Sequence, residues 1–139
     1  MSRFDGYTGH LFEEEVLGKC TITHRGYMRW QEAAQLVRKN QPHVMTPVAT
    51  QLQAELRKKL PGIDVRFYTA VGSTLDKMHS VDGFFEFEGK VTVTIDLTMN
   101  PHKDACKADV LVGQGDLSDL PAVAHRVARE LQIKLSRRM

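Results

Sequence analysis

Two carboxylates, Asp82 and Asp96, fall within a segment whose residue pattern predicts a β-hairpin. From residue 91 to residue 98, apolar side chains alternate with polar ones, which is the pattern of a strand with one buried face. The residues before the turn alternate in the same way, and a three-residue loop, 88–90, joins the two stretches. We therefore expect two antiparallel strands, each of which carries one of the acids.

The register of this hairpin is set by the alternation, because a slip of one residue would move every apolar side chain to the opposite face. It pairs Phe87 with Val91, Phe85 with Val93 and Val81 with Leu97. The same register places Asp82 directly across from Asp96, with their Cβ atoms about 5 Å apart, where like charges destabilise a sheet. Some other group must therefore compensate the two carboxylates.

Three groups could compensate this pair, and the sequence leaves all three open. A divalent metal ion is the functional possibility, because hard cations such as Mg²⁺ are held by one or two carboxylates together with waters and substrate phosphates. A Lys or Arg side chain that bridges the two acids is a structural possibility. The third is that this face of the hairpin is simply in contact with solvent.

The remaining elements predict one layered domain over residues 1–139, of the α/β (α+β) class. The helix over 46–60 is the best marked, since Thr46 is a good N-cap and Pro47 suits the first helical position. Other helices are expected at 8–17, 27–40 and from residue 118 or 119 to 135, and other strands at 19–23, 63–71 and 108–112. This order favours a central mixed β-sheet of about four strands flanked by helices.

The composition is that of an ordinary globular domain. The 139 residues are 42% hydrophobic and 26% charged, with a formal net charge of +2 that permits nucleic-acid binding without arguing for it. The two cysteines have no framework spacing, which suits a reducing compartment. No signal peptide or membrane-spanning stretch is recognisable, so we expect a cytoplasmic protein without a membrane partner.

A helix followed by a hairpin that carries V-D-G on one strand and I-D-L-T on the next resembles the PD-(D/E)XK nuclease superfamily. The resemblance covers residues 46–135 and leaves 1–45 as an N-terminal extension. It implies a restriction-endonuclease-like fold and cleavage of DNA that depends on Mg²⁺ (or Mn²⁺).

The resemblance also implies roles for particular residues. Asp82 matches the first metal-binding acid, Asp96 matches the second, and Glu55 matches the helix glutamate that some members add to the metal site. The family's lysine stands two residues after the second acid, where this chain has Thr98. Lys103 is the nearest candidate by sequence to replace it as the residue that orients or deprotonates the attacking water, or stabilises developing charge.

Further candidates for substrate contacts lie around the hairpin and on the final helix. They are Ser73, His79, Thr98, Asn100, Arg126 and Arg129. Ser73 and Asp76 fit better as a turn whose side chains bond the local backbone. Tyr27 and Trp30 could stack a base, although their helical spacing favours core packing. The acidic run 13–15 is most simply a solvated face.

These observations support three hypotheses. The first is a Mg²⁺-dependent DNA endonuclease or resolvase, working as a homodimer or within a larger nucleoprotein assembly. The second, prompted by Thr98 in place of lysine, is a catalytically inactive nuclease-like module that binds DNA or other proteins. The third is a protein–protein adaptor in which Asp82 and Asp96 are paired with cations of the fold.

Overall fold

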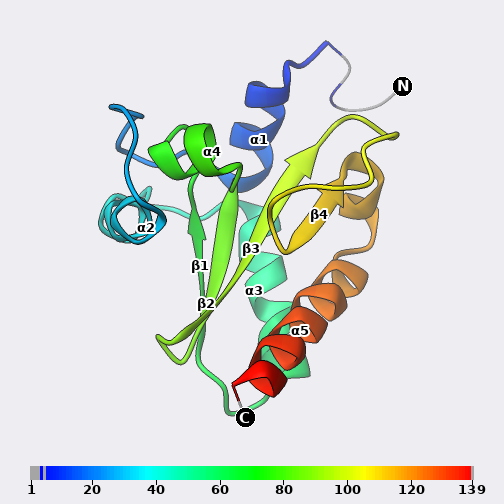
Figure 1. Cartoon of the computed structure of the whole chain (residues 1–139). Helices are drawn as coiled ribbons and strands as arrows, with labels where there is room; N and C mark the ends of the chain where they lie inside the picture. The colour runs from blue at the N-terminus through cyan, green and yellow to red at the C-terminus, as the bar shows by residue number, and fades with distance from the viewer. Residues whose placement is uncertain (1–3, 5, 139) are drawn as a thin grey trace.

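A mixed sheet with strand order β1-β2-β3-β4 lies at the centre of the computed structural model, which describes residues 4 and 6–138 (Figure 1). The strands are β1 (Val65–Thr69), β2 (Gly83–Phe87), β3 (Val91–Thr98) and β4 (Val110–Gly113). The helices are α1 (Gly9–Leu17), α2 (Trp30–Lys39), α3 (Pro47–Lys59), α4 (Thr74–His79) and α5 (Leu120–Arg137), with a short 3-10 helix η1 (Gln114–Ser118) before α5. The predicted α/β class with a four-stranded mixed sheet is therefore confirmed.

The sheet combines two kinds of pairing. β1, β2 and β3 form an antiparallel meander, and β4 then pairs in parallel with the second half of β3. As a result, β3 and β4 both end at the same side of the molecule, where β2 begins.

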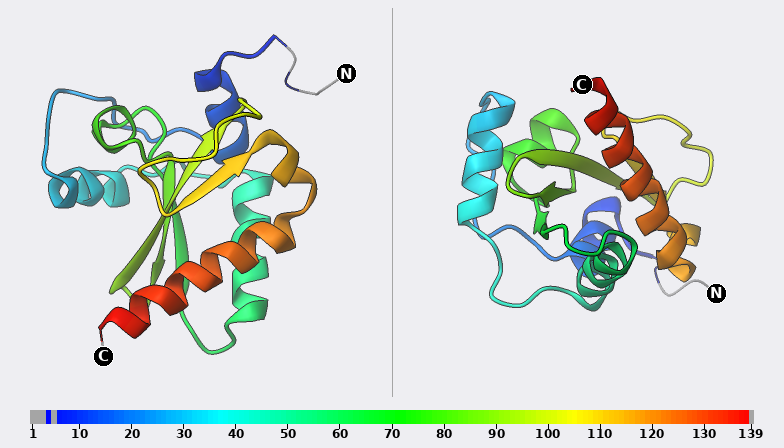
Figure 2. Two further views of the ribbon diagram at one scale, coloured as in Figure 1. Left: turned by 45° about the vertical axis from the view of Figure 1, so that its right-hand side comes forward. Right: turned by 90° about the horizontal axis from the view of Figure 1, so that it is seen from below.

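Helices cover both faces of the sheet (Figure 2). One core is formed by α1, α3 and α5 against one sheet face, to which Phe85 and Phe87 contribute. A second, smaller core is formed by α2 and α4 against the other face, to which Phe84 contributes. Successive side chains of β2 point to opposite faces of the sheet, and both sets are buried because helices cover each face.

Several helices begin where the sequence predicts. The side chains of Thr8, Thr46 and Asp119 accept hydrogen bonds at 3.2 Å from backbone N–H groups in the first turns of α1, α3 and α5. Each cap satisfies a donor that the helix itself leaves free. α1 ends at Leu17, where the predicted helix over 8–17 ends, and the C-cap Gly18 has φ at 82°.

The predicted strand over 19–23 is wrong. This segment makes one backbone bond to the chain just after β1, from Cys20 N to Val71 O at 3.0 Å, but forms no ladder. The outer edge of β1 is already occupied, because Gln53 Oε1 accepts from Phe67 N and Gln41 Oε1 accepts from Thr69 N, each at 2.9 Å. Side-chain amides thus take the place of a further strand.

The hairpin register is confirmed from the Gly83–Ile95 pair to the Phe87–Val91 pair. The predicted pairing of Val81 with Leu97 is wrong, since Val81 packs in the α2/α4 core instead. The chain leaves the unpredicted helix α4 through Ser80 in a left-handed conformation, with φ at 57°, and this turn carries residue 81 out of the ladder.

The described part of the predicted N-terminal extension 1–45 belongs to the same cores as the rest of the chain. Phe12, Val16 and Leu17 of α1 are buried in the larger core, and Ala34 and Val37 of α2 are buried in the smaller one. Within residues 4 and 6–138, none of the helices combines the length and apolar character that crossing a bilayer requires.

Candidate metal centre

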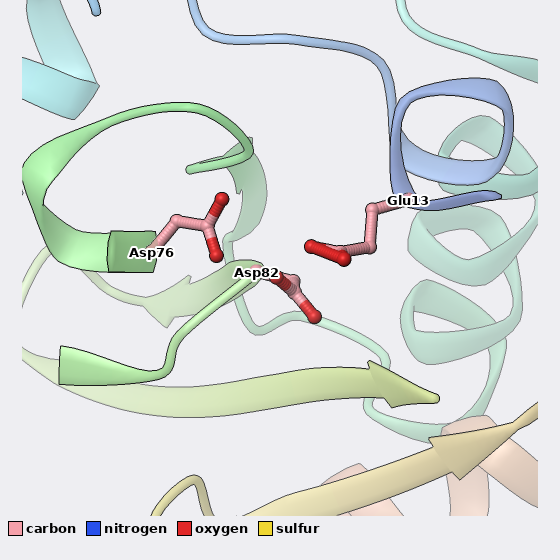
Figure 3. Close-up of side chains that lie close together, drawn as sticks. All are labelled: Glu13, Asp76 and Asp82. Carbon is pink, nitrogen blue, oxygen red and sulfur yellow. The ribbon is translucent and has the colours of Figure 1, made fainter. Parts of the chain in front are cut away.

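Three carboxylates converge where β2 begins, and Figure 3 shows them approaching from three directions. Glu13 comes from α1, Asp76 from α4, and Asp82 from the residue just before β2. One carboxylate oxygen from each lies within 4.8 Å of the others. We refer to Glu13, Asp76 and Asp82 as the acidic cluster.

Asp82 is the most deeply buried of these acids, with 2% of its surface exposed. Its Oδ2 accepts a hydrogen bond from Leu97 N at 2.7 Å, so the side chain occupies the place of the next ladder bond between β2 and β3. Burial, followed by the neighbouring Glu13 and Asp96, raises the pKa of Asp82 to about 11. No Lys or Arg forms an ion pair with Asp82 within the described part of the chain.

The residue after Asp82 must be glycine. A Cβ at Gly83 would stand 2.8 Å from two ring carbons of Phe67 on the neighbouring strand and 3.1 Å from Tyr68 O. Contacts under 3.0 Å are not tolerated by a ring packed in the core, so a side chain here would displace the start of β2. The V-D-G sequence therefore has a packing reason that also fixes the position of Asp82.

The two other acids of the cluster are held by different means. Burial raises the pKa of Glu13, and the charges of Asp76 and Asp96 raise it further, while a hydrogen bond with Asp82 acts in the opposite direction. Asp76 Oδ2 accepts from Gly72 N at 2.8 Å. The turn predicted around Asp76 is thus present, and the same carboxylate also belongs to the cluster.

Asp96 adjoins the cluster and has a cation of its own. It is 7% exposed, and its Oδ2 lies 2.9 Å from Lys103 Nζ. The hydrogen bond with Asp96 raises the pKa of Lys103. Of the three compensations considered from the sequence, a lysine is present, but it contacts Asp96 and does not bridge the two acids. Asp82 instead lies among other carboxylates.

The structure places the helix glutamate differently from the expectation. Glu55 of α3 pairs with Lys58 at 3.4 Å, one turn along the same helix, and it is not one of the clustered acids. The helix carboxylate that joins Asp82 is Glu13 of α1. The resemblance assigned only residues 46–135, so it had no place for a ligand from α1.

The other predicted substrate residues fall into two groups. Ser73 is buried, and its hydroxyl donates to Ala70 O at 2.6 Å, so it serves the turn before α4. His79 lies at the end of α4 with its Nε2 2.8 Å from Met28 O. Arg129 is exposed on α5.

One cavity of about 310 Å³ is lined by Thr98, Asn100, Lys103 and Arg126. It lies between the loop after β3 and α5, next to the ion pair of Lys103 with Asp96. Arg126 crosses the edge of β4, with Nη2 2.5 Å from Leu111 O. The cavity wall therefore holds two cationic and two neutral hydrogen-bonding side chains, and one of the cations, Lys103, pairs with Asp96. Asp104 and Asp116 also line it.

Sequence reasoning missed Glu13 and Asp76 as members of the cluster. A signal for Glu13 was present, since Phe12, Val16 and Leu17 are the buried face of α1 and Glu13 lies at the border of that face. Glu15, in contrast, is exposed. Asp76 gave no comparable signal, because nothing in the sequence predicted α4.

The donor set suits a hard divalent cation. Carboxylate oxygens are the protein ligands that Mg²⁺ prefers, and one or two of them with waters and phosphate are sufficient. Among the residues that the structure describes, no Lys or Arg forms an ion pair with a clustered acid. Comparison of the chain with known protein families, with curated proteins and with solved structures found no match.

Proposed function

We propose that this protein is a Mg²⁺- or Mn²⁺-dependent nuclease that hydrolyses phosphodiester bonds in DNA. The observation that carries the proposal is the convergence of Glu13, Asp76 and Asp82 on one point, with Asp96 and Lys103 directly beside it. Buried acids without a cation are costly to a fold, and they occur where a function needs them.

In this proposal the acidic cluster holds the metal ion, with Asp82 as its central ligand. A bound divalent cation supplies a more acidic water and charge relief at the phosphoryl oxygens. Leu97 N fixes the orientation of the Asp82 carboxylate through its bond to Oδ2. Glu13 and Asp76 are fixed independently by two helices on either side, so the donor set is preorganised.

Lys103 acts as a charged group rather than as a base. Its pKa is raised by the hydrogen bond with Asp96, so Nζ remains protonated near neutral pH. A protonated ammonium cannot accept a proton from water, but it can stabilise negative charge that develops on a phosphoryl oxygen. The position next to the second acid is the position that a PD-(D/E)XK-like site would require, reached here from the loop after β3.

The cavity beside Asp96 is the proposed path of the phosphate backbone. Lys103 and Arg126 provide the cations, and Thr98 and Asn100 provide hydrogen-bonding groups. Cutting both strands of a duplex requires two such sites, so a homodimer forms part of the proposal. Sedimentation of the protein with and without DNA tests that part separately.

The test of function is a cleavage assay on plasmid, duplex, junction and single-stranded DNA with Mg²⁺ or Mn²⁺. We expect cleavage by the wild type that disappears on chelation and in Asp82→Asn and Asp96→Asn. Glu55→Gln is the matched control, because it removes a carboxylate from a helix outside the cluster. It should cleave like the wild type.

Two results would contradict the proposal. Absence of cleavage on every substrate with either metal would favour the inactive binding module over the nuclease. Full activity of Asp82→Asn would remove the cluster from the reaction, whatever metal the protein requires.

A further inference from the structure

An exposed aromatic pair lies beside the acidic cluster. Tyr27 is 69% exposed, and its ring lies against that of His79 with 5.8 Å between centroids and 38° between planes. Trp30, three residues further, packs toward Phe84 in the smaller core instead. The structure thus separates two aromatic residues that the sequence grouped together, and it leaves Tyr27 at the surface.

The segment that carries Tyr27 is fastened to α4 and to the turn before it. His24 N donates to Gly72 O at 3.0 Å, and the side chain of Thr74 lies 3.0 Å from His24 Nδ1 and 3.2 Å from Gly26 O. His79 Nε2 must donate to Met28 O, because a carbonyl oxygen only accepts. The ring beneath Tyr27 therefore has a fixed orientation.

The same short helix connects this pair to the proposed metal site. Asp76 belongs to the acidic cluster, and His79 follows it by three residues on α4. Residues three apart lie on one side of a helix with Cβ atoms about 5–6 Å apart. Figure 1 shows the segment before α2 passing alongside α4, at the end of the molecule where α1 also lies.

The charge around Tyr27 favours an anionic partner. The segment 19–29 contains Lys19, Arg25 and Arg29 and has no acidic residue. Arg25, Arg29 and Lys77 of α4 are exposed. A positively charged, aromatic surface that adjoins a carboxylate cluster suits a strand whose phosphates contact the cations and whose reacting phosphate reaches the metal.

We propose that Tyr27, supported by His79, is a stacking platform for an unpaired base of the strand whose phosphodiester bond is cleaved. The proposal rests on the nuclease function and specifies its substrate class as DNA with unpaired bases at the site of cutting. Only an unpaired base offers its face to an aromatic ring, because in a duplex both faces are covered by neighbouring base pairs. A preorganised ring lowers the ordering cost of such a contact.

The test measures binding without hydrolysis. Fluorescence anisotropy in a chelating buffer at low salt compares a single-stranded oligonucleotide of about 15 residues with a blunt duplex of equal length. For Tyr27→Ala we expect affinity for the single strand to fall roughly 5- to 100-fold. Affinity for the duplex should stay the same, and Tyr27→Phe should bind like the wild type because it retains the ring.

Two controls separate stacking from other effects. Val44→Ala removes another exposed apolar side chain, which is 80% exposed and lies on the connection from α2 to α3, and it should not alter binding. Lys59→Gln removes a cation at the C-terminal end of α3, whereas Arg25→Gln removes one two residues before Tyr27. Only the Arg25 variant should weaken binding of the single strand. Unchanged melting temperatures would establish that each variant is folded.

The outcomes distinguish this inference from the nuclease proposal. If Tyr27→Ala binds single strands like the wild type, or loses duplex binding to the same extent, the platform is wrong even when cleavage is observed. Absence of any single-strand binding by the wild type would overturn it as well. If the wild type binds single strands through Tyr27 but cuts no DNA with Mg²⁺ or Mn²⁺, the platform stands and the nuclease proposal fails.

Discussion

Glu86 lies in β2 and Asp82 directly precedes that strand, but the two acids have opposite kinds of neighbours. Glu86 Oε2 accepts from Arg38 Nε at 2.9 Å and from Arg38 Nη2 at 2.6 Å. The guanidinium of Arg38 also lies over the ring of Phe84, 5.4 Å from its centroid. Asp82 is the more deeply buried of the two, yet its neighbours are a backbone N–H and other carboxylates.

Acids with a cationic partner, such as Glu86, stabilise the fold, whereas acids that lie among other carboxylates, such as Asp82, destabilise it. Asp109 belongs with Glu86, because its Oδ2 accepts from Lys134 Nζ at 2.6 Å and from Thr94 N at 2.9 Å. That network fastens α5 to β3. Within residues 4 and 6–138, no Lys or Arg forms such an ion pair with Glu13, Asp76 or Asp82, and this is the physical basis of the proposed metal site.

The largest effect expected from this contrast is on the pH dependence of stability without metal. The pKa of Asp82 in the folded protein, about 11, lies above its ordinary value of 3.8, so the native state retains a proton that the unfolded chain has lost. Stability should therefore fall as pH rises between these values, by up to about 1.4 kcal/mol per pH unit.

Urea unfolding at acidic, neutral and alkaline pH measures this slope. Asp82→Asn should flatten it and should be more stable than the wild type at neutral pH. The uncharged side chain keeps an oxygen that can accept from Leu97 N. A slope that is unchanged in Asp82→Asn would show that this carboxylate is not the group that retains the proton.

A divalent cation should produce the next largest effect. A ligand that binds only the native state stabilises it by about 2.7 kcal/mol at a hundredfold excess over its Kd. For a domain of this size that corresponds to a rise in Tm of roughly 10 °C. Differential scanning fluorimetry with Mg²⁺ or Mn²⁺ should show this rise in the wild type and its reversal by a chelator. The rise should be absent in Asp82→Asn.

Breaking the Glu86 pair should reduce stability without affecting the metal response. Glu86→Gln weakens two charge-assisted bonds in a place where the Glu86 side chain is 14% exposed, so we expect a loss of about 1–3 kcal/mol. Denaturant unfolding gives this value, and scanning fluorimetry with Mg²⁺ gives the response. If Glu86→Gln abolished the Mg²⁺ shift, the division between structural and metal-binding acids would be wrong.

The smallest effect is expected at the network of Asp109. Lys134→Met keeps most of the apolar stem but removes the ammonium from Asp109 and from Thr92 O, which lies 2.6 Å from Nζ. The two charged side chains are 28% and 24% exposed, so we expect a loss of about 0.5–1.5 kcal/mol in urea unfolding. A loss larger than that of Glu86→Gln would reverse the assigned order of the two pairs.

The sequence by itself determined the elements that depend on local pattern. Strict alternation predicted β3 and its partner, and it placed Asp82 near Asp96 because a strand's side chains have a period of two. Thr46 and Pro47 predicted the start of α3, since capping involves only neighbouring residues. The nearness of Lys103 to Asp96 followed from their separation of seven residues, although its geometry did not.

Only the tertiary structure decided which acids meet. Glu13 and Asp82 are 69 positions apart in sequence, and no local pattern relates the face of α1 to the start of β2. Asp76 lies beside these two acids because the chain turns back at Ser80, directly after α4. Ser80 has a left-handed conformation that its residue type does not predict. Likewise, the partial burial of Trp30 and the exposure of Tyr27 depend on how α2 and α4 pack on the second face of the sheet. The carboxylate cluster forms because elements distant in sequence pack together, and the local patterns of a single sequence do not predict that packing.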